Sequence, residues 1–155
     1  MNTEQIVIRR ANAHDLPEIY ALEQECFISP WTAELLLLDI CASEQNLYYV
    51  MEKEGRIIGF AGINVVLDEA HIRKICIAPD MRQHGYGSLF LRELEKQAHS
   101  RGAEGLTLEV RSSNKAAITM YEHFGFRQEG LRKKYYDNKE DALIMWKHDI
   151  AGIQE

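Results

Sequence analysis

The sequence predicts an α/β protein in which helices lie on the faces of a mixed β-sheet. Three observations support this class. Segments with alternating apolar residues lie near both ends of the chain, amphipathic runs separate them, and β-branched and aromatic residues dominate 46–79. The length of 155 residues suits one domain, 1–155, with enough apolar residues for a single core.

The amino-terminal half is expected to form strand 5–9, helix 14–27, a helix at about 32–42 and three antiparallel strands within 46–79. The alternation in QIVIR indicates the first strand, and apolar residues near helical spacing indicate the first helix. Asp15 before Pro17 suits the start of that helix. The Glu54-Gly55 pair is the expected turn between two of the three strands.

The carboxy-terminal half is expected to form helix 85–101, strand 106–110, helix 114–124 and strands at about 126–135 and 142–148. Apolar residues at helical spacing indicate the long helix, and LTLEV alternates as a strand does. Gly102 and Gly125 are expected to end the two helices, because glycine readily adopts the left-handed conformation found there.

Composition limits the possible functions. The net charge of -6 and the sequence pI of about 5.5 argue against a nucleic-acid binder that relies on phosphate contacts. Cys26, Cys41 and Cys76 form no CxxC pair and have apolar neighbours, so we expect buried free thiols, as in a reducing cytosol. MNTEQIVIRR lacks the apolar stretch of a signal peptide, and Leu35–Leu38 is too short an aliphatic run to cross a membrane. We therefore expect a soluble cytoplasmic protein without membrane partners.

The segment RQHGYG lies between a predicted strand and the long helix. The first turn of a helix offers N–H groups and a partial positive charge, which suit a phosphate. Gly85 and Gly87 would let a pyrophosphate approach the backbone, and Arg82 and His84 add positive charge. There is no GxxxxGK[ST], and Phe90 stands where a dinucleotide-binding fingerprint needs a third glycine. By itself the glycine pair is equally compatible with an ordinary loop.

The same segment matches R/Q-x-x-G-x-G/A, the coenzyme A loop of the GNAT family of N-acetyltransferases, and the element order resembles that family over nearly the whole chain. Within the family the sequence is most similar to the bacterial ribosomal-protein alanine N-acetyltransferases. The similar stretches are SPW (29–31), VVLDEA (65–70), LEVRSSNKAAITMYEHFGF (108–126) and RKKYYDNKEDALIM (132–145). The resemblance implies the GNAT (acyl-CoA N-acyltransferase) fold, whose mixed central sheet is mostly antiparallel and flanked by helices. It also implies acetyl-CoA as the donor and the N-terminus of a basic ribosomal protein as the acceptor.

The resemblance also implies where the coenzyme binds. The loop would hold the pyrophosphate, and free backbone groups of the preceding strand would pair with the pantetheine arm like an added strand. The residues expected to contact the coenzyme are Ile75, Cys76, Ile77, Arg82, Gln83, His84, Gly85, Tyr86, Gly87, Ser88 and Asn114. Spacing alone leaves Asn114 as a helix N-cap, a role that Ser112 or Ser113 could equally fill. Cys76 is not expected to be a nucleophile, because direct transfer needs no covalent enzyme.

Acetyl transfer from a thioester to an amine needs a base for the amine, a polarised carbonyl and an acid for the thiolate. Glu109 alternates with the leucines of LTLEV, and spacing alone favours a solvated glutamate paired with Arg111. The resemblance instead implies that Glu109 is the base, with Glu69 in reserve. Tyr121 shares a helix face with Asn114, where a tyrosine is more often a core residue. The resemblance implies that Tyr121 protonates the thiolate.

On the acceptor side the resemblance places Trp31, Tyr135, Tyr136 and Glu69 beside the groove for a peptide N-terminus. Arg73-Lys74 departs from the less charged residues expected in this branch of the family, which leaves the acceptor open. The same fold also serves acetylation of lysine side chains, polyamines and antibiotics, and a non-catalytic acyl-CoA-binding module is a further alternative. The six histidines show no metal-ligand spacing, so we predict no metal.

Overall fold

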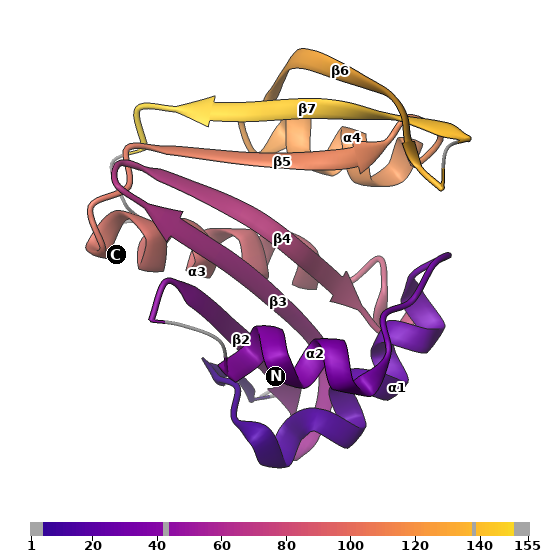
Figure 1. Ribbon diagram of the computed structural model, residues 1–155. Coiled ribbons are helices and arrows are strands. Elements are labelled where there is room, and N and C mark those ends of the chain that lie inside the picture. Colours follow the sequence, from indigo (N-terminus) through magenta and orange to yellow (C-terminus); the bar gives the residue numbers. More distant parts are fainter. Residues whose placement is uncertain (1–4, 42–43, 138, 151–155) are drawn as a thin grey trace. The chain divides into compact units, whose positions relative to one another are not determined.

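The computed structural model describes residues 5–41, 44–137 and 139–150 (Figure 1). Its helices are α1 (Leu16–Cys26), α2 (Ala33–Cys41), α3 (Tyr86–Ser100) and α4 (Lys115–His123), with 3-10 helices at Ala13–Asp15 and Pro79–Met81. Its strands are β1 (Ile6–Arg10), β2 (Asn46–Lys53), β3 (Arg56–Val66), β4 (Glu69–Ile77), β5 (Gly105–Arg111), β6 (Arg127–Tyr136) and β7 (Glu140–His148). The described parts of all predicted helices and strands are present, with ends within two residues of those expected; residue 42 of the second predicted helix lies outside the described residues. No helix in the described ranges is both long and apolar enough to span a membrane.

The strands form one sheet with the hydrogen-bonded order β1-β2-β3-β4-β5-β7-β6. The pairs β1/β2, β2/β3, β5/β7 and β6/β7 are antiparallel. The pair β4/β5 is parallel, with His71 opposite Thr107. The predicted mixed, mostly antiparallel sheet with flanking helices is therefore confirmed.

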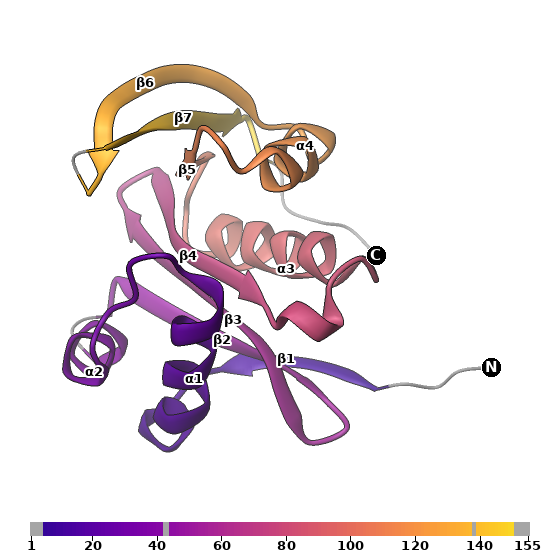
Figure 2. The ribbon, with the colours of Figure 1, turned by 90° about the vertical axis from the view of Figure 1, so that its right-hand side faces the viewer.

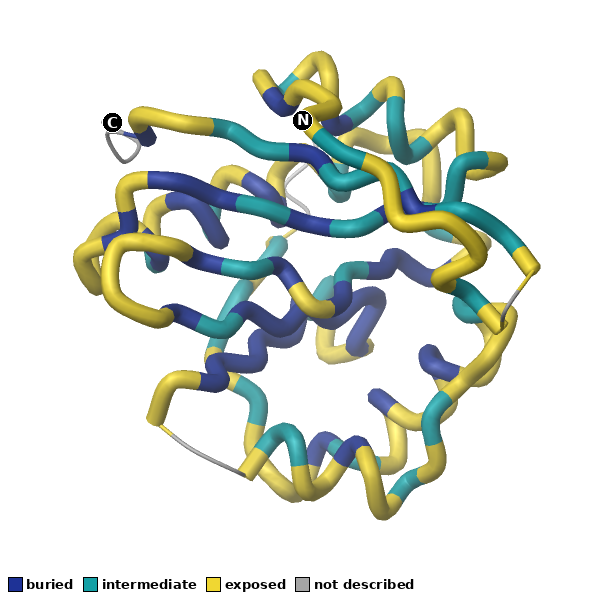
Figure 3. The backbone as a smooth tube through the Cα atoms, turned by 45° about the horizontal axis from the view of Figure 1, so that its top comes forward, coloured by how far each residue is buried: buried dark blue, intermediate teal, exposed yellow. Residues whose placement is uncertain are grey.

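The contacts between residues divide the protein into two compact units, each built from two separate stretches of the sequence. The first contains the chain up to Asn64 together with Lys74–Phe90. Its core forms because β2 and β3 are buried along almost their whole length and α1 and α2 lie on one face of them (Figure 1). Burial is not uniform along the chain (Figure 3): β2 and β3 are largely buried, whereas residues 54–55 between them are exposed. The largest side chains of this core are Ile19, Leu36, Tyr48 and Phe60.

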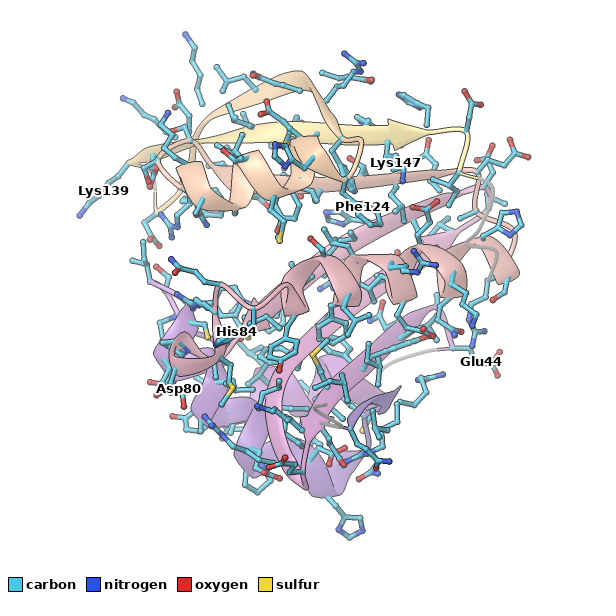
Figure 4. The ribbon with its side chains drawn as sticks, turned by 180° about the vertical axis from the view of Figure 1, so that it is seen from behind. Glu44, Asp80, His84, Phe124, Lys139 and Lys147 are labelled. Atoms are coloured by element: carbon cyan, nitrogen blue, oxygen red, sulfur yellow. The ribbon has the colours of Figure 1, made fainter. Side chains whose placement is uncertain are left out.

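The second unit contains Val65–Arg73 and the chain from Leu91 onward. Here β5, β7 and β6 form an antiparallel ribbon, and α4 lies along one face of it (Figure 2). The Nζ atom of Lys147 lies 4.2 Å from the centre of the Phe124 ring and 2.7 Å from Oε1 of Glu95 (Figure 4). This lysine therefore ties β7 to the end of α4 and to α3.

One side-chain expectation is wrong. Of the three free thiols only Cys76 is buried, while Cys26 is partly exposed and Cys41, the last residue of α2, is exposed. The helix start expected at Asp15 before Pro17 is confirmed, because Asp15 is the N-cap residue of α1 and Pro17 lies in the first turn. The Asp15 carboxylate nevertheless makes no capping hydrogen bond to α1. It instead accepts hydrogen bonds from both terminal nitrogens of Arg9 and from the backbone N–H of Asn12, so its acceptor capacity is used elsewhere.

Candidate active site

In the first unit the predicted phosphate loop connects β4 to α3. The Nε group of Arg82 donates a hydrogen bond of 2.9 Å to the carbonyl of Ile77, which folds the loop back on the end of the strand. Gln83 and Gly85 have φ angles of 67° and 83°, in the left-handed region. The N–H of Leu89 donates to the carbonyl of Gly85, so Gly85 directly precedes the first helical turn.

The first turn of α3 contains the backbone N–H groups that we predicted from the sequence to bind a phosphate. Gly87 and Ser88 lie in the first turn of α3, where N–H groups have no acceptor within the helix. The His84 and Tyr86 rings lie 5.7 Å apart and flank the turn (Figure 4 labels His84). The positive φ of Gly85 explains the need for glycine there, since an added side chain would be strained by the backbone rather than by its neighbours.

The strand before this loop carries Ile75, Cys76 and Ile77. A Cβ atom added to Gly59 would lie 2.6 Å from the Cys76 carbonyl oxygen, so β3 approaches β4 closely at this point. Burial, followed by its hydrogen bond with Cys26, raises the pKa of the Cys76 thiol well above its usual range. A protonated, buried thiol is a poor nucleophile, which agrees with direct transfer.

Lys74 is buried in the first unit, where it forms an ion pair. Its Nζ atom lies 3.0 Å from Oε2 of Glu23, and the two side chains are 8% and 0% exposed. The same ammonium group lies 4.1 Å from the Trp31 ring centre and 4.6 Å from that of Phe27. The departure at Arg73-Lys74 is thus explained for Lys74: its charge is neutralised inside the protein.

Glu23 also fixes the chain at Trp31. The backbone N–H of Trp31 donates a hydrogen bond of 2.9 Å to Oε2 of Glu23. Trp31, predicted to border the acceptor groove, is therefore held at its backbone by the glutamate and at its ring by Lys74. The acceptor role itself remains a prediction.

In the second unit Glu109 and His71 form a hydrogen-bonded pair. Nε2 of His71 lies 2.6 Å from Oε1 of Glu109, and their side chains are 38% and 17% exposed. This hydrogen bond is the main cause that lowers the pKa of Glu109, with smaller contributions from the charges of His71 and Arg132. Glu109 is therefore held as a carboxylate in a half-buried position.

The alternative pairing of Glu109 with Arg111 is wrong. Arg111 lies 3.2 Å from Glu140 and 3.5 Å from Asp137, and its guanidinium group stacks 4.2 Å from the Tyr136 ring centre. Burial raises the pKa of Tyr136 to about 12, and the nearby charge of Glu109 adds to the effect. The Tyr136 hydroxyl therefore keeps its proton beside the Glu109 carboxylate.

The other predicted residues of this unit have simpler surroundings. Asn114 caps α4, with its side chain accepting a hydrogen bond from the N–H of Ala117, so the capping role falls to Asn114 itself. Tyr121 is buried, with its ring edge-on to Phe126 at 5.8 Å. Glu69 is exposed at the start of β4. Tyr135 is 47% exposed and packs edge-on against Tyr136.

The second unit thus places the Tyr136 hydroxyl within reach of the charge of Glu109 and adds His71 as the hydrogen-bond partner of this glutamate. The sequence reasoning missed both His71 and Glu23. A signal for His71 existed, because Glu69, His71 and Arg73 alternate along one face of a strand. Within the described ranges no group of three His, Cys, Asp or Glu side chains is placed to hold a metal ion.

Comparisons with known proteins agree on a family. The model of the Acetyltransferase (GNAT) family matches residues 16–126. The [ribosomal protein bS18]-alanine N-acetyltransferase of Escherichia coli K12 is 38% identical over 134 residues, covering 84% of this chain and 89% of that protein. The enzyme of the same name from Salmonella typhimurium is 36% identical over 148 residues, covering 94% and 96%. The crystal structure of the ribosomal-protein-S18-alanine N-acetyltransferase from Escherichia coli superposes with a TM-score of 0.86 at 34% identity, covering 97% of each chain.

Proposed function

The chain belongs to the GNAT acetyltransferase family, and we propose that it transfers the acetyl group of acetyl-CoA to the N-terminal alanine of ribosomal protein bS18 in the cytoplasm. The choice of acceptor is supported by the similarity to enzymes named for this reaction, which extends over most of the length of both chains. A ribosomal protein that binds RNA is basic, and the net charge of -6 on this chain suits such a partner.

The coenzyme half of the proposal uses the loop between β4 and α3. The first-turn amides of α3, with Gly87 and Ser88, would bind the pyrophosphate, and Arg82 and His84 would supply positive charge. The backbone of Ile75–Ile77 would pair with the pantetheine arm. Asn114 would contact the same arm in addition to capping α4.

The part of the proposal that concerns the acceptor amine uses Glu109 and its partner His71, which we call the base centre. An N-terminal amine has a pKa of about 7.7–8.0 and a lysine side chain about 10.4, so near neutral pH the N-terminal amine is deprotonated a few hundredfold more often. A half-buried carboxylate that is hydrogen-bonded to a histidine is adequate for such a substrate. Trp31, Tyr135, Tyr136 and Glu69 would border the groove that receives the peptide.

Tyr121 is the proposed acid. When the amine nitrogen bonds to the carbonyl carbon and the C–S bond breaks, the departing thiolate takes the phenolic proton of Tyr121. A phenol with an ordinary pKa of about 10 can protonate a thiolate whose conjugate acid is near 8.5 with only a modest penalty. A module that only binds the coenzyme needs neither Glu109 nor Tyr121.

Thiol-release kinetics test this function. Acetyl-CoA is mixed with a peptide carrying a free N-terminal alanine, or with a matched peptide whose N-terminus is blocked and whose only amine is a lysine. We expect turnover on the first peptide, and fast turnover only on the second would contradict the proposed acceptor.

Tyr121→Phe should lower kcat by about 10²-fold or more and leave coenzyme affinity nearly unchanged. Tyr20→Phe, on the exposed side of α1, is the control, and an unchanged kcat in Tyr121→Phe would remove the acid from the mechanism.

A further inference from the structure

The base centre of the second unit contains two groups that can hold a proton. Glu109 is two residues beyond Thr107, the register partner of His71, so both side chains lie on the same face of the sheet. The Nε2 edge of the His71 ring faces Oε1 of Glu109 at 2.6 Å, and the ring is 38% exposed. One edge of the imidazole is therefore held by the carboxylate, while the ring as a whole remains reachable from solvent.

The two groups differ in how well they keep a proton near neutral pH. The ordinary pKa of an imidazole is about 6.5 and that of a glutamate about 4.3. The hydrogen bond from His71 lowers the pKa of Glu109 further. In such a pair the carboxylate is the acceptor of the hydrogen bond, and the imidazole is the group whose second nitrogen is available to a substrate proton.

We propose that His71 is a catalytic residue that takes the proton of the acceptor ammonium group, with Glu109 as the partner that orients its ring. This inference rests on the proposed function. In the resting pair Nε2–H donates to Glu109 and Nδ1 carries a lone pair. The ammonium N–H bond breaks as an N–H bond forms at Nδ1, directly or through water. The amine electron pair attacks the thioester carbonyl, and the C–S bond breaks as the Tyr121 hydroxyl gives its proton to the thiolate. The acylated nitrogen then gives its second proton to the Tyr121 phenolate, which leaves the neutral amide and restores the phenol. The imidazolium then returns its proton to solvent through the exposed ring.

The other charged and titratable groups around the pair suit this assignment. Arg132 of β6 is a permanent cation whose charge acts on Glu109. Tyr136 of β6 has its pKa raised to about 12 and stays protonated. On β4 itself, Glu69 and Arg73 lie on the same face as His71, one on each side.

Replacing His71 by glutamine separates proton transfer from positioning. A glutamine N–H can still donate to Glu109, but the amide cannot accept a proton. We expect His71→Gln to lower kcat by about 10²-fold with little change in the KM for acetyl-CoA. The acidic limb of the kcat profile should lose one ionisation, and free imidazole should restore activity to His71→Ala. His148→Gln is the matched control, since His148 is an exposed histidine paired at 2.8 Å with Glu129, and its kcat should not change.

Several outcomes would overturn the inference. Wild-type kcat and an unchanged pH profile in His71→Gln would show that the ring takes no proton. Should the His71 variants fail to fold, the ring of His71 is followed by NMR in the wild type and in Glu109→Gln. The chemical shift of Nε2 must change when its carboxylate partner is removed, and an unchanged shift rejects the pair. Wild-type turnover on the alanine peptide tests the proposed function separately, because the ratio between variant and wild type can be measured on whichever amine is acetylated.

Discussion

The buried Glu23–Lys74 pair predicts a large loss of stability when only one partner is removed. Lys74→Met leaves the Glu23 carboxylate, which is 0% exposed, without its countercharge. Removing one member of a buried ion pair typically costs about 3–5 kcal/mol, because the remaining charge is neither solvated nor paired. One carboxylate oxygen of Glu23 already has no hydrogen-bond partner within the described structure, so no spare donor replaces the ammonium group.

The loss can be measured by urea denaturation. A loss of about 4 kcal/mol lowers the midpoint by about 2 M if the denaturant slope is about 2 kcal/mol per M. The double variant Glu23→Gln/Lys74→Met should recover most of this loss. It removes both buried charges, and the glutamine oxygen can still accept the hydrogen bond from the Trp31 N–H.

An exposed ion pair in the same unit serves as the control. Arg56 and Asp80 form two hydrogen bonds but are 50% and 61% exposed, so Arg56→Met should cost less than about 1 kcal/mol. The reasoning is refuted if Lys74→Met unfolds within about 0.5 M urea of the wild type while keeping the same slope. It is equally refuted if the double variant is no more stable than Lys74→Met.

Two further predictions concern a carboxylate and a glycine. Hydrogen bonds from Arg9 lower the pKa of Asp15, so its contribution to stability is present above the ordinary pKa and is lost as the pH falls through the lowered value. The wild-type urea midpoint should therefore fall more steeply than that of Asp15→Asn on acidification below about pH 4, and parallel curves would contradict this. Gly59→Ala should cost about 1–3 kcal/mol in thermal unfolding, because its Cβ would lie 2.6 Å from a carbonyl oxygen of β4. Gly55→Ala, with open space around it but a φ of +82°, should cost about 1 kcal/mol or less, and equal losses would contradict the clash.

Periodicity and turn residues were sufficient to predict the elements of this fold. The turn at Glu54-Gly55 and the helix ends at Gly102 and Gly125 all have positive φ, as glycine at these places indicated. A turn or helix end depends on the conformation of one or two residues, so glycine at the right place is enough to predict it. The start of the first helix at Asp15 was predicted as well, but the partner of the Asp15 carboxylate was not, since Arg9 belongs to strand β1.

The phosphate loop could also be predicted, because its parts are contiguous in the sequence. Arg82, Gly85 and Gly87 lie within six residues, and the structure confirms the loop and the helix start expected there, with a left-handed φ at Gly85; phosphate binding stays a prediction. The partners of Glu109 could not be predicted in the same way. Arg111 is two residues away on the same strand face, whereas His71 is brought in by the parallel register of β4 with β5.

Lys74 shows why register and burial have to be considered together. Alternation along β4 puts Lys74 on the same face as Ala70, Ile72 and Cys76, all of which are buried. The alternation of buried residues along β4 therefore predicts that Lys74 points into the core. The lysine can stay there because Glu23 of α1 supplies the countercharge. Alternation along a strand is therefore enough to give the direction of the Lys74 side chain. It does not give the partner, because Glu23 lies on another element. The partner of His71 could not be predicted for the same reason, because Glu109 lies on another strand. In each unit a basic side chain of β4 is held by a carboxylate distant in sequence. Such residues stay in a fold only if their pairing repays the cost of burial or their chemistry is used, and the substitutions at His71 and Lys74 distinguish these two causes.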